Sequence, residues 1–417
     1  MGAMPPGLGP IICVVGARPN YMKMAPLLAA FERNARLPRA VLVHTGQHYD
    51  AALNDRLFVD LQLPQPDLNL EVGSGSHATQ TAEVMRRFEP VLDRYDPCAV
   101  IVVGDVNSTL ACSLVAVKKA VPVVHVEAGL RSFDRSMPEE VNRVLTDQIS
   151  DLLYTTERLA AANLAREGIP AERIAFVGNV MIDSLRTNLP RAVPPAETLR
   201  RAGKEDFLDL LGGGHSSSSL PLPGRGHPIS SLPLSGGGQG GGHRYGVVTL
   251  HRPSNVDRPE ALLESLELLR AVSDRLPLIC PLHPRTRQNV ARFGMESLLA
   301  TPRIADLPPQ GYLEMLGLMA NAAVVVTDSG GVQEETTALG VPCLTMRDNT
   351  ERPITVDEGT NVIVGRDRAL TLRLLDEIVA GGGKRGRSPE LWDGHASERI
   401  ANHLAGWLAR RQALVGA

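Results

Sequence analysis

The sequence contains only five cysteines in 417 residues, and no two of them have the C-x-x-C spacing of a zinc or redox site. Each lies in or beside an apolar run such as IICVV, which is typical of a buried thiol in a reducing compartment. We therefore expect structural thiols and no metal site. The five are Cys13, Cys98, Cys112, Cys280 and Cys343.

Long apolar segments are also absent from the sequence. The first apolar run, residues 11–15, is shorter than the roughly 7–15 residues of a signal-peptide core, and no positively charged segment precedes it. No stretch approaches the roughly 18 apolar residues of a membrane span. We expect a cytoplasmic protein that has no membrane partner.

The chain has no excess of either charge, because 43 Lys and Arg residues face 46 Asp and Glu, a net charge of -3. This balance gives no electrostatic case for nucleic acid as a partner, so any anion site must be a local cluster. Gly236, Gly238 and Gly241 fit G-x-G-x-x-G, but they lead into a strand rather than from a strand into a helix. That context excludes a dinucleotide fingerprint, and no cofactor is expected.

Short β-branched runs alternate with helical patterns along the first half of the chain. The helical patterns include 21–34 and 108–120. Alternation of this kind predicts a parallel sheet, and near-continuous apolar strands predict helices on both of its faces. The expected strands are 11–16, 40–46, 99–105, 121–129, 151–156 and 173–179.

The alternation stops at 212–243, where 22 of 32 residues are Gly, Ser or Pro. Such a composition cannot bury enough apolar surface to offset its ordering entropy, so we expect a flexible loop. Strands are expected again at 246–251, 277–284, 322–331, 341–347 and 360–365, and helices at 259–276, 332–340 and 397–415.

We therefore predict two α/β domains, each with its own sheet. The first would span 1–184, with 397–417 packing back on it, and the second 185–396. Ligands of such sheets bind at the carboxyl ends of the strands, so two facing domains would form a cleft lined by the distinctive polar residues.

Two turns have the features of phosphate sites. Residues 16–20 join the first strand to a helix that carries Lys23, so backbone N–H groups and a helix dipole would face an anion, and Arg18 could add two donors. Residues 327–335 repeat this arrangement in the second half, where glycines allow a diphosphate to approach the backbone and Glu335 could accept from ribose hydroxyls. The alternatives are an ordinary β–α turn and a glycine-rich helix cap.

Carboxylates follow two of the buried strands. Asp105 and Glu127 are well placed for proton transfer, although acids at strand ends also cap helices. Glu139 and Arg143 are four residues apart on a helix, where a surface ion pair is the simpler interpretation. The neighbouring 131–135, with two arginines and an aspartate, instead indicates a functional cluster.

Histidine and arginine end two strands of the second half. His251 and Arg252 follow one strand, and His283 and Arg285 follow the next. Together with the serine–glycine turn they suggest a diphosphate pocket, which Arg352 would complete.

These motifs together resemble the non-hydrolysing UDP-N-acetylglucosamine 2-epimerase family. The resemblance implies two Rossmann-like domains of the glycosyltransferase B type, with the C-terminal helix crossing back to the first domain. It also implies a UDP-sugar substrate and a homodimer. The matching segments are GARPNYMKMAP, TGQH, GDVNSTLA, HVEAGLRS, MPEEVNR, VTLHRPSN, HPRTR, TDSGGVQEE and RDNTERPITV.

Site residues are carried over from the family by motif position. The residues matching its catalytic positions are Asp105, Glu127, Glu139, Arg143 and His251. Those matching nucleotide- and phosphate-binding positions are Arg18, Lys23, Gln310, Met315, Ser329, Gly330, Gly331, Glu335 and Arg352. Met315 stands where relatives often have an aromatic residue near the uracil.

The implied reaction is C2 epimerisation of UDP-N-acetylglucosamine to the manno sugar through loss and re-addition of UDP, which would supply cell-surface polysaccharide synthesis. Tyr49 and Asp50 replace the Arg-Glu of relatives that a second substrate molecule activates, and 74–80 lacks their basic residue. We therefore expect no such activation. Alternatives are a modified substrate such as a 2,3-diacetamido uronate, a hydrolysing epimerase or glycosyltransferase on the same fold, and a non-catalytic sensor.

Overall fold

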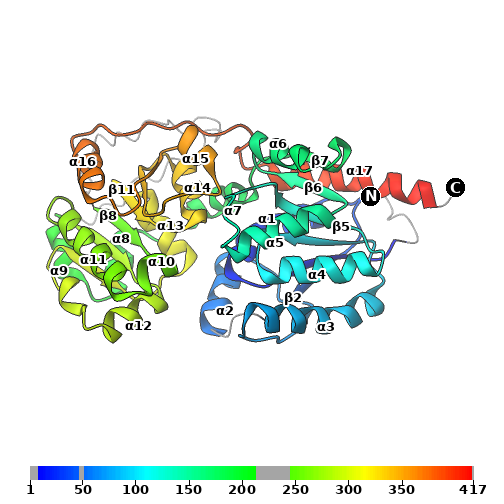
Figure 1. Cartoon of the computed structure of the whole chain (residues 1–417), viewed down its shortest axis with the longest axis horizontal. Helices are drawn as coiled ribbons and strands as arrows, with labels where there is room; N and C mark the ends of the chain where they lie inside the picture. Colours follow the sequence, from blue (N-terminus) through cyan, green and yellow to red (C-terminus); the bar gives the residue numbers. More distant parts are fainter. Residues whose placement is uncertain (1–7, 47–50, 213–244, 416–417) are drawn as a thin grey trace. The chain divides into compact units, whose positions relative to one another are not determined.

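The computed structural model describes residues 8–46, 51–212 and 245–415, which belong to two compact units (Figure 1). The first unit comprises the chain up to Thr187 together with Glu390–Ala417, and the second is Asn188–Pro389. The expected loop at 212–243 lies almost wholly outside the described residues, as do Tyr49, Asp50 and the excluded glycine pattern.

The first unit is built on a parallel seven-stranded sheet of order β3-β2-β1-β4-β5-β6-β7. Its order reverses between β1 and β4, so crossover helices cover both faces. The strands are β1 Ile11–Val15, β2 Ala40–His44, β3 Leu68–Asn69, β4 Ala99–Val103, β5 Val123–Ala128, β6 Leu152–Thr155 and β7 Ile174–Phe176.

Helices α3, α4 and α5 pack in one row beside this sheet, and α1 packs against α2 and α17 (Figure 1). The helices are α1 Arg18–Arg33, α2 Ala51–Asp60, α3 His77–Tyr95, α4 Asn107–Lys118, α5 Pro138–Ile149, α6 Arg158–Arg166, α7 Val180–Asn188 and α17 Ala396–Val415.

The C-terminal segment returns to the first unit, as the resemblance implied. Asp183 accepts hydrogen bonds from the backbone N–H groups of Ala396 (3.1 Å) and Ser397 (2.7 Å), which open α17. The buried Trp392 donates from Nε1 to the carbonyl of Thr156 at 3.1 Å. These contacts make 390–417 an integral part of the first unit.

The second unit contains a parallel six-stranded sheet of order β10-β9-β8-β11-β12-β13. The strands are β8 Gly246–Thr249, β9 Leu278–Pro281, β10 Ile304–Leu307, β11 Val324–Thr327, β12 Cys343–Thr345 and β13 Asn361–Ile363. Five of the described helices in this unit begin at a proline. Proline suits the first turn of a helix, because its ring fixes φ at a helical value and the N–H group that it lacks would have no partner there. The helices are α8 Pro195–Arg201, α9 Glu205–Leu210, α10 Pro253–Val256, α11 Pro259–Ser273, α12 Pro284–Arg292, α13 Tyr312–Ala320, α14 Gly330–Leu339, α15 Pro353–Asp357 and α16 Arg368–Val379.

Both faces of the second sheet are buried. In β11, Val324 and Val326 belong to one apolar cluster and Val325 belongs to another. Because successive side chains of a strand point to opposite faces, the two clusters lie on the two sides of the sheet. This confirms the prediction drawn from the continuous apolar runs.

Two expected helix starts were wrong. Helix α1 begins at Arg18 rather than at residue 21, because Pro19 is accommodated in its first turn. Helix α14 begins at Gly330 rather than at residue 332. The connections from β1 to α1 and from β11 to α14 are therefore shorter than the sequence suggested. Among the described residues, no helix has the length and apolar character needed to cross a membrane.

Candidate active site

The order of the first sheet reverses between β1 and β4, and the loops after these strands are joined by Asn20. Its Oδ1 accepts from the backbone N–H groups of Gly16 (3.2 Å) and Ala17 (3.0 Å), and its Nδ2 donates to the carbonyl of Val103 at 2.8 Å. The side chain is buried. A single amide therefore fixes both strand ends, a role that the sequence analysis missed because it treated Asn20 only as part of a turn.

Lys23 and Glu127 form a buried ion pair at this point. The Nζ of Lys23 donates to Oε1 of Glu127 at 2.6 Å, and both side chains are at most 5% exposed. Glu127 has a φ of 71°, a left-handed conformation that costs a non-glycine residue about 1–3 kcal/mol. It falls where the register between β5 and β6 shifts, and such irregularities re-aim side chains near functional sites.

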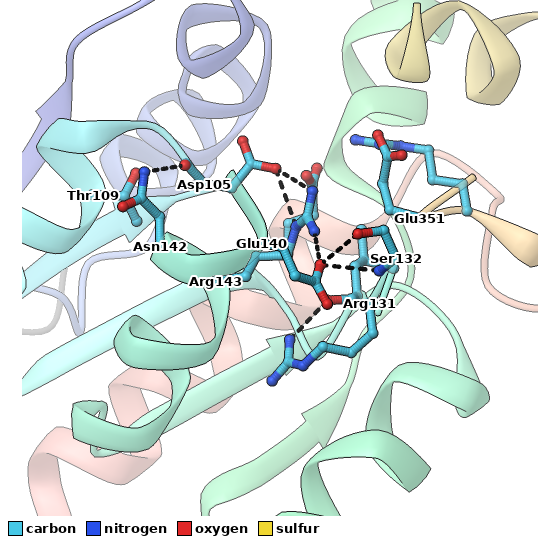
Figure 2. A network of polar contacts seen from close by, with 12 residues as sticks. Asp105, Thr109, Arg131, Ser132, Glu140, Asn142, Arg143 and Glu351 are labelled. Carbon is cyan, nitrogen blue, oxygen red and sulfur yellow. Dashed lines mark hydrogen bonds and ion pairs between the residues drawn. The ribbon is translucent and has the colours of Figure 1, made fainter. Parts of the chain in front are cut away.

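Asp105 is held by Arg143 (Figure 2). Nε and Nη2 of Arg143 lie 3.1 and 2.6 Å from the same Oδ2 atom, and Nη1 lies 2.5 Å from Oε2 of Glu140. Asn142 Nδ2 donates to the backbone carbonyl of Asp105 at 2.9 Å. The Asp105 side chain keeps 20% exposure, whereas Arg143 is buried, so the carboxylate is the accessible member of the pair.

The suggested ion pair between Glu139 and Arg143 is replaced by one with Glu140. The Glu140 carboxylate is buried and accepts from the backbone N–H groups of Ser132 and Phe133, both at 2.9 Å. These donors belong to the loop before α5, and they fix the orientation of the Glu140 side chain. Glu139 is half-buried and has no hydrogen bond or ion pair within the described part of the chain.

Four ionisable side chains contact one another in series, beginning at His125 on β5. The Nδ1 atom of His125 is 2.6 Å from Oδ1 of Asp147, whose Oδ2 is 2.7 Å from Nη2 of Arg131. Arg131 in turn forms two hydrogen bonds with Glu167, at 2.8 and 2.6 Å. Burial favours a raised pKa for the Asp147 carboxyl, but His125 and Arg131 hold that pKa below its usual value.

The second sheet has an equivalent reversal between β8 and β11, and His251 follows β8 there. Its Nδ1 is 3.0 Å from Oδ1 of the buried Asp328, while one third of its side chain stays exposed. Asp328 also accepts from the backbone N–H of Arg252 at 2.9 Å and from Asn255 Nδ2 at 3.1 Å. Burial opposes the ionised form, yet these donors and His251 lower the pKa of the Asp328 carboxyl.

Arg352 is placed against the start of α14. Its Nε lies 2.9 Å from Oε2 of Glu334, and its Nη1 lies 2.5 Å from Oε1 of Glu351. A Cβ atom added to Gly330 would lie 2.5 Å from that Nη1, so glycine allows the guanidinium to lie directly against this turn. Arg347 also pairs with Glu351, at 2.8 Å. The second sheet thus presents arginines beside the glycine turn.

Other expected binding residues of the second unit lie around the same strand ends. Glu335 is buried and lies near Tyr312, whose pKa is raised well above its usual value by burial and then by that carboxylate. Gln310 follows β10 and donates to the carbonyl of Pro308 at 2.8 Å. Ser329 and Gly331 are half-buried beside Gly330.

Three other residues were expected at the nucleotide or diphosphate site, but in the described part of the structure none of them is seen to face a ligand-binding turn. Met315 packs against an apolar core cluster of its unit. Arg285 points to Asp257, 2.6 Å from its Oδ1 atom, although the rings of His251 and His283 do lie 5.5 Å apart. The side chain of Arg18 lies outside the described residues. No group of three or more His, Cys, Asp or Glu able to hold a metal occurs within the described ranges.

The model of the family described as UDP-N-acetylglucosamine 2-epimerase matches residues 30–209 and 236–405. The chain belongs to the UDP-N-acetylglucosamine 2-epimerase family. An enzyme of that name from Methanocaldococcus jannaschii is 37% identical over 395 residues, covering 94% of this chain and 97% of the relative. A UDP-2,3-diacetamido-2,3-dideoxy-D-glucuronate 2-epimerase from Pseudomonas aeruginosa is 36% identical, covering 95% and 99%.

Solved structures agree with this membership of the UDP-N-acetylglucosamine 2-epimerase family. The Methanocaldococcus jannaschii enzyme in complex with UDP-GlcNAc and UDP has a TM-score of 0.76 at 36% identity, covering 94% of this chain and 99% of that one. The Neisseria meningitidis enzyme bound to UDP-GlcNAc has a TM-score of 0.74 at 25% identity, covering 94% and 99%. The predicted family and the two-domain glycosyltransferase B type of fold are therefore confirmed.

Proposed function

We propose that this epimerase interconverts UDP-N-acetylglucosamine and UDP-N-acetylmannosamine. The observation that carries the proposal is the pair of carboxylates at the switch point of the first sheet, each with a cation: Asp105 with Arg143, and Glu127 with Lys23. The enzymes of similar sequence and structure that bear this name support the assignment.

The chemistry explains why carboxylates and cations are both needed. The C2 proton of the sugar is not adjacent to a carbonyl, so its direct removal is too difficult. Loss of UDP solves the problem: a base takes the C2 proton, C1 and C2 form a double bond, and the C1–O bond breaks to give UDP and 2-acetamidoglucal. UDP then adds back at C1 while a second carboxylic acid delivers a proton to the other face of C2. The two carboxyl groups end with exchanged protonation states, and proton exchange with solvent restores them.

We assign the proton transfers to carboxylates of the first unit, and most of the proposed UDP-binding residues belong to the second. Asp105, Glu127 and Glu139 supply the acids and bases, and Arg143 and His251 complete the catalytic set. A buried cationic partner keeps a carboxylate ionised and able to accept a proton.

Binding of UDP is assigned to the turn after β11 and its surroundings. The N-terminus of α14 presents backbone N–H groups, and Gly330 leaves space for Arg352 beside them. Glu335 would accept from the ribose hydroxyls. The proposed binding residues are Arg18, Lys23, Gln310, Met315, Ser329, Gly330, Gly331, Glu335 and Arg352.

Two further properties are proposed with the function. We infer a homodimer from the family resemblance, and light scattering of the purified protein would measure its mass. We infer a cytoplasmic enzyme because all five cysteines are free, four of them fully buried.

The proposal is tested by incubating UDP-N-acetylglucosamine with the protein in heavy water and following proton NMR. We expect deuterium at C2 and a manno product. No exchange and no manno product would contradict the proposal, and free N-acetylmannosamine would instead indicate a hydrolysing epimerase. Replacing Asp105 or Glu127 by its amide should abolish exchange while UDP binding, measured by calorimetry, persists. Exchange retained in both variants would overturn the residue assignment.

A further inference from the structure

His125 is fully buried on β5, and both of its ring nitrogens face hydrogen-bond acceptors. Nε2 lies 2.8 Å from the backbone carbonyl of Gly104, and Nδ1 lies 2.6 Å from Oδ1 of Asp147. A carbonyl oxygen has only lone pairs to offer, so Nε2 must carry a proton to form this bond.

The Asp147 carboxylate lies against the other ring nitrogen of His125, Nδ1, and favours a proton there. Its Oδ2 accepts from the backbone N–H of Gly129 at 3.0 Å and lies 2.7 Å from Nη2 of Arg131. A carboxylate with these donors is ionised, consistent with its lowered pKa, so Nδ1 is also a donor. The charged groups facing the ring then form a balanced chain, two cations with two anions: His125, Asp147, Arg131 and Glu167.

The carbonyl that accepts from Nε2 of His125 belongs to Gly104, which lies next to the buried ion pair of Lys23 and Glu127. Gly104 has a φ of 67°, and a Cβ atom there would lie 2.9 Å from Nζ of Lys23 and 3.8 Å from Oε1 of Glu127. Gly104 therefore abuts the buried ion pair directly, and its carbonyl belongs to the peptide that begins Asp105. On the other side of Glu127, Gly129 is held by Asp147.

We propose, resting on the function proposed above, that His125 is a positioning residue for the C2 chemistry. The Nε2–H group of its ring fixes the peptide between Gly104 and Asp105, and so sets where Asp105 lies relative to Glu127. His125 itself touches neither side-chain carboxylate. Displacing a reacting group by about 1 Å costs about 100-fold in rate, so a hydrogen bond at this peptide has a large effect on turnover.

Two amide variants separate positioning from folding. The side-chain amide of glutamine extends about as far from the backbone as Nε2 of the histidine that it replaces. The shorter side-chain amide of asparagine extends only about as far as Nδ1. His125→Gln therefore keeps a donor for Gly104, and His125→Asn keeps one only for Asp147. Both lose the same charge from the same buried place. Ser113→Ala is the control, because it removes a buried hydrogen bond within α4, to the Thr109 carbonyl, without touching Gly104.

We expect kcat for the C2 exchange to fall by about 100-fold in His125→Asn and by less than about tenfold in His125→Gln. KM for the UDP-sugar and melting temperature should be similar in the two variants, and Ser113→Ala should match the wild type in kcat. Equal kcat values for the two amide variants, with an active wild type, would overturn the positioning role. Absence of exchange in the wild type would overturn the proposed function instead.

The protonation of the ring is measured independently of activity. Protein labelled with 15N-histidine should show Nε2 of His125 protonated, as the bond to the Gly104 carbonyl requires. An Nε2 atom without a proton would overturn the proposal, because the bond to the Gly104 carbonyl could not form, and this readout does not require either amide variant to fold.

Discussion

Arg143 places two of its nitrogens against a single carboxylate oxygen of Asp105, with Nε at 3.1 Å and Nη2 at 2.6 Å. The third nitrogen of the guanidinium reaches Glu140, which is itself fixed by backbone donors of the preceding loop. The Asp105 carboxylate, two residues after β4, is thus tied to α5 and to the loop before it through one buried arginine.

Replacing Arg143 by methionine should destabilise the protein as well as inactivate it. The change leaves Glu140 buried without its guanidinium, and losing one partner of a buried pair costs about 3–5 kcal/mol in free energy of unfolding. Urea denaturation measures this loss. Glu139→Gln is the matched comparison, because Glu139 is half-buried and its side chain makes no hydrogen bond or ion pair among the described residues. Its unfolding free energy should change by less than about 0.5 kcal/mol while C2 exchange is lost. An Arg143→Met protein as stable as the wild type would contradict this.

Adding one methyl group at Gly330 should weaken UDP binding. The new Cβ would lie 2.5 Å from Nη1 of Arg352 and 2.6 Å from Oε1 of Glu351, so both side chains must move. We expect the Kd for UDP, measured by calorimetry, to rise about tenfold, which corresponds to about 1.4 kcal/mol.

Gly406→Ala provides the control for this substitution. Gly406 lies within α17, where a Cβ atom would make only an ordinary contact, 3.5 Å from Arg410. Alanine should leave the Kd for UDP unchanged and stabilise the helix by about 0.5–1 kcal/mol. Unaltered UDP binding in Gly330→Ala would show that Arg352 has no part in the nucleotide site.

Acid should destabilise the protein partly through Asp328. Its pKa is lowered in the folded state, so its contribution to stability is complete above the unfolded value, near 3.8, and is lost as pH falls through the folded value. Asp183 has the opposite sign, because burial raises the pKa of its carboxyl, so its contribution falls as pH rises above 3.8.

Urea denaturation between about pH 3 and pH 6 distinguishes these two carboxylates. Compared with the wild type, Asp328→Asn should lose less stability on acidification, and Asp183→Asn should lose more. Parallel pH profiles for all three proteins would be incompatible with the opposed shifts.

Most of the strands and their burial could be predicted from the sequence because continuous β-branched runs are a local signal. The edge strands β3 and β10 were missed, because neither contains such a run. The strand-end residues followed from the same reasoning, since carboxyl ends of parallel strands share one edge of a sheet. His251 and Asp328, for example, follow neighbouring strands β8 and β11 and do meet.

The partner of Arg143 could not be predicted in this way. Residues three and four apart on a helix are both neighbours, so spacing alone cannot choose between Glu140 and Glu139. The choice depends on the N–H groups of Ser132 and Phe133, which lie in a loop whose path is not a local property of α5. The buried link from His125 to Asp147 was missed for a similar reason, because it joins residues 22 positions apart.

The return of 390–417 to the first unit has a consequence for biosynthesis. A ribosome releases the strands of that unit long before it translates Trp392 and the residues that Asp183 caps. Domains usually fold as their sequence emerges, but here the packing of the first unit can be completed only after residues 390–415 have been translated. The second unit, being continuous in sequence, can complete its fold first, and a nascent chain stalled before residue 390 should present an unfinished N-terminal half to chaperones.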